Sequence, residues 1–128
     1  MRLAHIGMDI RVVGETTTPA IAGGDLLVAV SGSGETGVTL YVAGAAAKAG
    51  ADVAAVVADG SSALARLAEI VLVIPGMVKT GKGMQSSQMP GSLFEQSAFL
   101  ALDAIVADLA AERGQSHEAM RRRHANLE

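Results

Sequence analysis

The sequence contains no cysteine and no tryptophan, and only two per cent of its residues are aromatic. Without cysteine, disulfides and thiolate metal ligands are excluded. Half of the chain is nevertheless hydrophobic, so its core must consist of Ala, Val, Leu and Ile. Such a core is typical of buried parallel strands packed under helices of small residues. The chain also lacks an uncharged apolar run of about 18 residues, which a membrane span needs.

An excess of basic charge is missing as well. Ten Lys and Arg residues stand against 13 Asp and Glu residues, which gives a formal charge of −3. A nucleic-acid-binding protein normally shows a basic face in such totals, so this class is not favoured. No apolar segment of a signal peptide follows Met1. We therefore expect a cytoplasmic protein of one domain, residues 1–128, because this length suits a single core.

Apolar runs alternate with helical patterns along the chain. The run LLVAV at 26–30 is apolar at every position, so we expect a strand buried on both faces. Residues 76–91 contain several glycines and show neither a helical nor a strand period, so we expect a loop there. The full set of predicted strands is 10–13, 26–30, 53–58 and 70–74, and that of predicted helices is 37–49, 61–69, 92–112 and a short one after Gly114. Right-handed crossovers then give an α/β fold with one parallel, doubly wound sheet.

The segment SGSGET, residues 31–36, joins the predicted strand 26–30 to the helix 37–49. Ligands of doubly wound sheets bind beyond the carboxyl ends of the strands, where this turn lies. Backbone N–H groups of a glycine-rich turn at a helix N-terminus favour phosphate. The hydroxyls of Ser31, Ser33 and Thr36 add further donors. The alternative to a phosphate site is a purely structural role, in which SGSGET is a tight turn that caps the following helix.

A dinucleotide site is a second interpretation of the same turn. Gly32, Gly34 and Gly37 match G-x-G-x-x-G, and Asp59 follows about 20 residues later, as that fingerprint requires. The carboxylate of Glu35 fits less well, because it falls inside the phosphate turn. Asp59 stands before Gly-Ser-Ser and equally suits a turn. A P-loop is excluded, since no Lys-Ser or Lys-Thr pair follows the glycines.

Three segments together resemble a known family. They are TTTPAIAGGDLLVAVSGSGETGVTLYVAGAAAKAGADV from residue 16, GSLFEQ from residue 91 and RRRHANLE from residue 121. They resemble the sugar isomerase (SIS) domain of the 6-phospho-3-hexuloisomerases. The resemblance implies a flavodoxin-like fold and isomerisation of a 3-hexulose 6-phosphate to fructose 6-phosphate, in the ribulose monophosphate pathway of formaldehyde fixation. It further implies a homotetramer that needs neither metal nor cofactor.

The resemblance begins part-way along the family pattern. Family members start with a helix, a first strand and a turn of the type GRSG, and only then reach the segment that here follows Met1. The resemblance therefore implies that this chain lacks the family's first strand. In the family's sheet that strand lies at the centre, between the strands that correspond to 10–13 and 26–30. We expect strand 10–13 either to stand one strand width from 26–30 or to pair with it. In both cases exposed apolar surface would favour self-association.

Glu95 is the candidate base. Moving a carbonyl from C3 to C2 through an enediolate needs one group that takes and returns a proton, and a carboxylate suits this work. At helical spacing Glu95 lines up with Phe99, Leu102 and Val106, an apolar stripe. Ser92-x-x-Glu95 also matches a capping box, a purely structural role. The resemblance favours catalysis, because the family's base falls on Glu95.

The remaining site residues are implied by the resemblance. His124 would donate a proton to the enediolate oxygen, although a lone histidine in RRRH otherwise suits a solvated helix. The implied phosphosugar ligands are Ser31, Gly32, Ser33, Gly34, Glu35, Thr36, Ser86 and Ser87. Lys79 and Lys82 could reach phosphate or belong to a surface loop. A non-catalytic SIS module, which would bind a phosphosugar without Glu95 or His124, stays a third interpretation.

Overall fold

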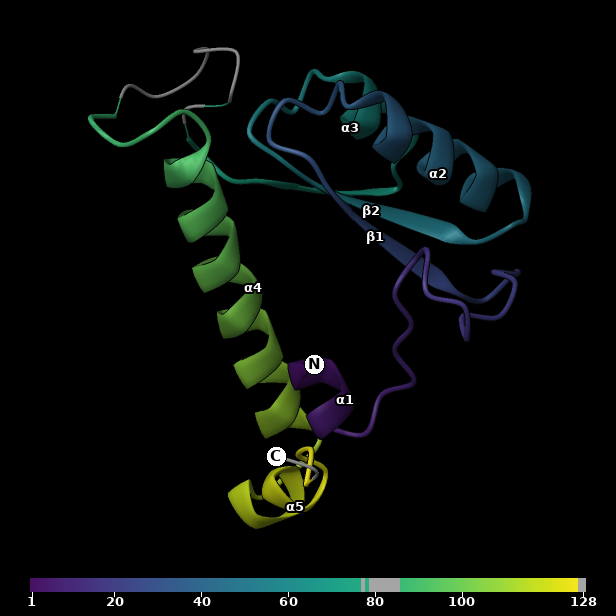
Figure 1. Ribbon diagram of the computed structural model, residues 1–128, viewed down its shortest axis with the longest axis vertical. Helices are drawn as coiled ribbons and strands as arrows, with labels where there is room; N and C mark the ends of the chain where they lie inside the picture. The colour runs from purple at the N-terminus through teal and green to yellow at the C-terminus, as the bar shows by residue number, and fades with distance from the viewer. Residues whose placement is uncertain (77, 79–85, 127–128) are drawn as a thin grey trace. The chain divides into compact units, whose positions relative to one another are not determined.

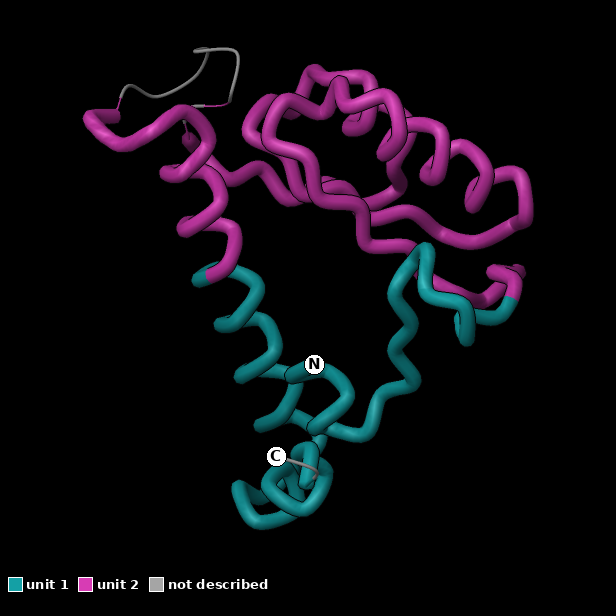
Figure 2. Tube along the Cα trace, viewed as in Figure 1, with its two compact units in different colours: residues 1–19, 100–128 teal, residues 20–99 magenta. Residues whose placement is uncertain are grey.

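The structure is a computed structural model that describes residues 1–76, 78 and 86–126. The chain divides into two compact units (Figure 2). Unit 2 is Ala20–Phe99, and unit 1 combines Met1–Pro19 with Leu100–Glu128. The division falls inside the longest helix, α4 (Ser92–Glu112). That the two units form one domain stays a prediction.

Unit 2 contains a parallel sheet of three strands in the order β1-β2-β3, of which Figure 1 labels β1 and β2. These are β1 (Leu26–Val30), β2 (Asp52–Val57) and β3 (Ile70–Val73). Between them the chain forms α2 (Gly37–Lys48) and α3 (Ala63–Leu67). The order βαβαβ and the parallel pairing confirm the predicted α/β class.

The core of unit 2 lies between the sheet and α2 and α3, which cover the same face (Figure 1). Ala43 and Ala46 of α2 are fully or almost fully buried, and their small side chains let the helix approach the strands closely. Strand β1 alternates between buried and exposed positions, and Val28 is 47% exposed. The expectation that 26–30 is buried on both faces is therefore wrong, because both helices pack on one face.

The ends of these helices follow from local hydrogen bonds. Ser62 caps α3, since its Oγ accepts from the N–H of Ala65 at 3.4 Å. The helix ends earlier than the predicted residue 69. Ala68 is extended, and Glu69 already pairs with β2, because its N–H donates to the Val53 carbonyl at 3.0 Å. The Glu69 carboxylate in turn accepts from the Val53 N–H at 2.7 Å.

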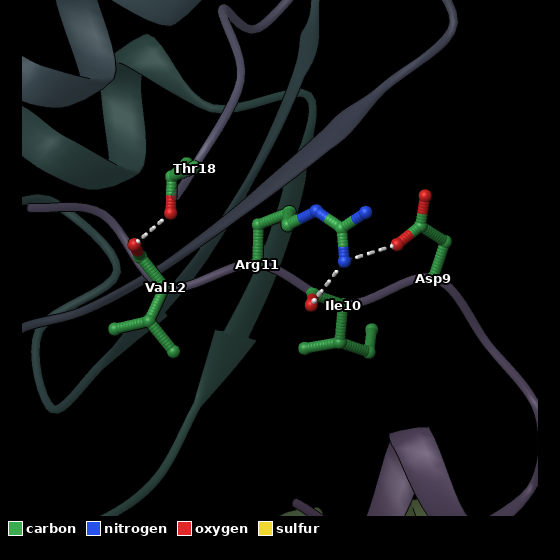
Figure 3. A network of polar contacts seen from close by, with 5 residues as sticks. All are labelled: Asp9, Ile10, Arg11, Val12 and Thr18. Atoms are coloured by element: carbon green, nitrogen blue, oxygen red, sulfur yellow. Dashed lines mark hydrogen bonds and ion pairs between the residues drawn. The ribbon is translucent and has the colours of Figure 1, made fainter. Parts of the chain in front are cut away.

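The predicted strand at 10–13 is wrong, because residues 10–12 have no regular structure and a turn begins at Val13. The Val12 carbonyl, which a ladder would pair with another strand, accepts instead from the Thr18 hydroxyl at 2.6 Å (Figure 3). It also accepts from the N–H of Glu15 at 3.2 Å. The Arg11 guanidinium forms an ion pair with Asp9 at 2.7 Å (Figure 3). Local partners thus satisfy polar groups that a strand would need for pairing.

Unit 1 contains α1 (Arg2–His5), the second part of α4 and α5 (His117–Arg122). The guanidinium of Arg123 donates to the His5 carbonyl at 3.1 Å and to Gln115 Oε1 at 2.9 Å. The predicted helix 92–112 and the short helix after Gly114 are both confirmed. None of the helices in the described part of the chain combines the length and apolar character needed to cross a membrane.

Candidate functional site

The turn SGSGET continues the ladder of β1 before it turns into α2. The Ser31 N–H donates to the Val56 carbonyl at 3.0 Å, and the Gly32 carbonyl accepts from Ala58 at 2.9 Å. The hydroxyls of Ser31 and Thr36 lie 3.0 Å apart and form a hydrogen bond across the turn. The first and last residues of the motif are therefore held together at the carboxyl end of β1.

Several backbone N–H groups of this turn have no partner. Within the described residues no acceptor is found for the N–H of Gly32, Ser33 or Thr36. Thr36 occupies the N-cap position of α2, yet its hydroxyl caps none of the helix N–H groups. The first-turn N–H groups of a helix lack internal acceptors, and α2 is 12 residues long. The turn thus offers unpaired donors beside the positive end of a helix dipole, the two features that favour an anion.

Gly34 and Glu35 serve the turn differently. Gly34 has φ +64, and its N–H donates back to the Ser31 carbonyl at 2.9 Å. Its carbonyl accepts from Leu64 at 3.0 Å. The Glu35 carboxylate accepts from the N–H of Ala63 at 2.8 Å. These two residues therefore attach the turn to the N-terminus of α3.

A cavity of about 320 Å³ lies beside the turn, within unit 2. It brings Glu95 of α4 to the same space as the phosphate turn. Of the predicted ligands, Gly34 and Glu35 do not line it. The complete lining consists of Val30, Ser31, Gly32, Ser33, Thr36, Thr39, Val78, Gly91, Phe94 and Glu95.

Glu95 lies in the first turn of α4 and is exposed. Its N–H donates to the Gly91 carbonyl at 2.9 Å, and the Ser92 N–H donates to Met89 at 3.0 Å. The capping box of Ser92 and Glu95 is not formed, because the helix already includes Ser92 and neither side chain bonds the other's N–H in the described chain. The Glu95 carboxylate is thus free of the structural role that the capping interpretation gave it.

His124 lies in unit 1, where its ring packs against that of His5 with centroids 4.9 Å apart. It is exposed, and its Nδ1 lies 3.3 Å from the Ala125 carbonyl. Of the neighbouring arginines, Arg122 forms an ion pair with Glu118 at 2.8 Å. The catalytic role of His124 stays a prediction.

The loop residues divide in two. Lys79 and Lys82 lie outside the described residues. Ser86 and Ser87 are described but do not line the cavity. The Ser86 hydroxyl accepts from the N–H of Gln88 at 3.1 Å. Their contact with a phosphosugar stays a prediction.

Five lining residues were not predicted as site residues from the sequence, namely Val30, Thr39, Val78, Gly91 and Phe94. Thr39 stands three positions after Thr36, the spacing that puts two residues on one face of a helix, so its place could have been found. Phe94 is 4% exposed and belongs to the segment GSLFEQ, but its residue type indicated no role in the site, because a single aromatic residue in a helix suits any core.

A larger cavity, of about 510 Å³, lies within unit 1 among α1, α4 and α5. Arg2 and Asp103 both line this cavity and form an ion pair with each other at 2.7 Å. None of its lining residues belongs to a glycine-rich turn. Among the described residues no three His, Asp or Glu side chains come together as a metal site.

Asp59, the acidic residue of the dinucleotide interpretation, accepts from the N–H and hydroxyl of Ser61, at 2.8 and 2.6 Å. These local bonds favour its interpretation as a turn residue.

Curated relatives decide the family. No family model matches the sequence. A 3-hexulose-6-phosphate isomerase of Mycobacterium gastri is 46% identical over 129 residues, which cover 100% of this chain and 65% of that protein. A protein of the same name from Bacillus subtilis is 38% identical, over 100% of this chain and 70% of the relative. The chain belongs to the 3-hexulose-6-phosphate isomerase family.

A solved structure agrees with this family. A hypothetical protein of Methanococcus jannaschii, whose structure was taken to infer a molecular function of 3-hexulose-6-phosphate isomerase, matches with a TM-score of 0.86 at 30% identity. The match covers 99% of this chain and 68% of that one. The chain thus spans about two thirds of the length of these 3-hexulose-6-phosphate isomerase relatives. The family predicted from SGSGET, GSLFEQ and RHANLE is confirmed.

Proposed function

We propose that this chain contributes the isomerase activity of its family, the interconversion of 3-hexulose 6-phosphate and fructose 6-phosphate. One observation carries the proposal: the turn, with its unpaired N–H donors, and Glu95 line the same cavity. A phosphate held by the turn would leave the sugar carbons to extend toward the carboxylate. The cavity therefore offers one group for each end of the substrate.

The reaction needs a proton to move between neighbouring carbons. Glu95 would remove the proton from C2 of the 3-hexulose, which forms an enediolate across C2 and C3. The same carboxylate then returns the proton to C3, and the carbonyl forms at C2 as in fructose 6-phosphate. The enediolate oxygens also exchange a proton, and His124 is the proposed donor, from its own chain or from a second copy. A homo-oligomer, a tetramer by family resemblance, is part of this proposal.

The test is Glu95→Gln, which keeps the shape of the side chain and removes its basic oxygen. We expect the turnover of hexulose phosphate to fall by about 10²–10⁴-fold, the usual contribution of a general base. Competition by inorganic phosphate should stay, since the turn is unchanged. Stability should fall by no more than about 1 kcal/mol, because only a first-turn charge is lost and no capping box breaks.

Glu112→Gln is the matched control, the same change at the exposed far end of the same helix. It should leave turnover within about twofold of the unchanged protein, since it lies far along α4 from the cavity lining. Full turnover by Glu95→Gln would contradict the proposal. An unchanged protein that binds phosphosugars without converting them would instead favour a non-catalytic module.

A further inference from the structure

Phe94 lies directly against the phosphate turn. It precedes Glu95 in the first turn of α4 and is 4% exposed. A Cβ atom placed on Gly32 would stand 3.0 Å from Phe94 Cδ1 and 3.2 Å from its Cγ. Such distances are tighter than ordinary contact, so the ring occupies the space that a side chain at position 32 would need. The glycine therefore leaves room for the aromatic ring beside the turn.

The backbone of Phe94 is held on another side by Gly76, which follows β3. A Cβ atom on Gly76 would lie 2.8 Å from Phe94 Cα and 2.9 Å from its N. Only a glycine lets the two backbones approach so closely. Val78 lies near the same point, with its Cγ1 3.2 Å from a Cβ atom placed on Gly32. Phe94 is thus fixed between the end of β3 and the turn after β1.

Glu95 itself has no comparable support. Among the described residues its carboxylate accepts no hydrogen bond and forms no ion pair, and the side chain is exposed. The position of this carboxylate at the cavity is therefore set by the backbone of the first turn of α4. That backbone is fixed by the residue before it.

We propose that Phe94 is a positioning residue, which sets the place of the Glu95 carboxylate over the phosphate turn through its contact with Gly32. The inference rests on the proposed function and deepens it. An error of about 1 Å in the position of a reacting group can lower a rate by about 10²-fold. Because the ring touches a residue of the phosphate turn, the binding of phosphate in the turn and the alignment of the Glu95 carboxylate depend on the same packed contact.

A double-mutant cycle tests the contact. Gly32→Ala should push the ring and lower kcat by about 10–100-fold, and Phe94→Leu should loosen the helix and lower kcat as well. The smaller leucine leaves room for the added methyl, so the double variant should show at least about three times the kcat of Gly32→Ala, a non-additivity expected only of residues in contact. KM and the inhibition constant of inorganic phosphate should change much less. Purely additive losses in kcat would overturn the proposal.

Phe99→Leu is the matched control, since this phenylalanine on the same helix is 56% exposed and lines no part of the cavity. Its kcat should stay within about twofold. Melting temperatures of all variants separate misalignment from unfolding. If Phe94→Leu does not fold, Phe94→Met takes its place, because a flexible side chain of similar volume is tolerated better.

A second measurement does not depend on turnover. Inorganic phosphate is titrated into the labelled protein, and amide signals are followed by NMR. In the unchanged protein the amides of Gly32 and Glu95 should shift together, with one apparent affinity. In Phe94→Leu only the turn should respond. An equal response of Glu95 in both proteins overturns the inference, whereas a protein that responds to phosphate in this way but never isomerises sugar refutes only the proposed function.

Discussion

Gly34→Ala should destabilise the chain more than any ordinary surface substitution. The residue has φ +64, and a methyl group there would overlap the Oγ and Cβ of Ser62. The left-handed backbone costs an alanine about 1 kcal/mol. Overpacking against a buried neighbour adds about 1–3 kcal/mol. When Ser62 is displaced, helix α3 loses its N-cap hydrogen bond, which is worth about 1 kcal/mol. The expected loss is therefore about 3–5 kcal/mol, a large part of the stability of a typical domain.

Urea unfolding measures this loss. With a slope of about 2 kcal/mol per molar urea, the midpoint should fall by about 2 M. Gly24→Ala is the matched control, because Gly24 has φ +90 but no atom within 4 Å of a new methyl group. It carries the backbone strain alone, so its midpoint should fall by about 0.5 M. Equal losses in the two variants would refute the contact between Gly34 and Ser62.

Two further predictions concern the surroundings of the turn. Glu35→Ala should cost about 1–2 kcal/mol in the same urea experiment, because its carboxylate caps the N–H of Ala63, whereas Glu35→Gln keeps an acceptor and most of the stability. Loss of phosphate binding in both variants at unchanged stability would instead make Glu35 a ligand, as the resemblance implied. Tyr41 on α2 is 78% exposed, so if this face joins two copies, Tyr41→Glu should weaken association by at least about tenfold in sedimentation; an unchanged distribution contradicts that interface.

The order of the elements could be predicted because each depends on its own sequence. The apolar run LLVAV is long enough for a strand but too short for a helix, and α4 repeats its apolar residues over many turns. Burial of β1 was not predictable in this way, since a strand apolar on both faces does not say which face its neighbours cover. The segment 10–13 has the composition of a strand, but pairing needs a partner, and local hydrogen bonds took its place.

Within the candidate site, some residues could likewise be predicted from their type and others only from the three-dimensional structure. Ser31, Ser33 and Thr36 were found from residue type, because hydroxyls in a glycine-rich turn suit phosphate wherever they point. The separate role of Glu35 depends on the turn's three-dimensional path, which carries its carboxylate to α3. Phe94 depends on two glycines far away in the sequence, Gly32 and Gly76. Only long-range packing reveals such a residue.

Helix α3 has only five residues, too few to persist alone in water. Its first N–H groups, those of Ala63 and Leu64, are bonded by Glu35 and Gly34. The helix and the turn therefore open and close as one local unfolding unit. Amides that would exchange rapidly with solvent at the start of a free helix are here protected by a segment some 30 residues earlier. A ligand that holds the turn closed would slow hydrogen exchange in α3, a helix it never touches.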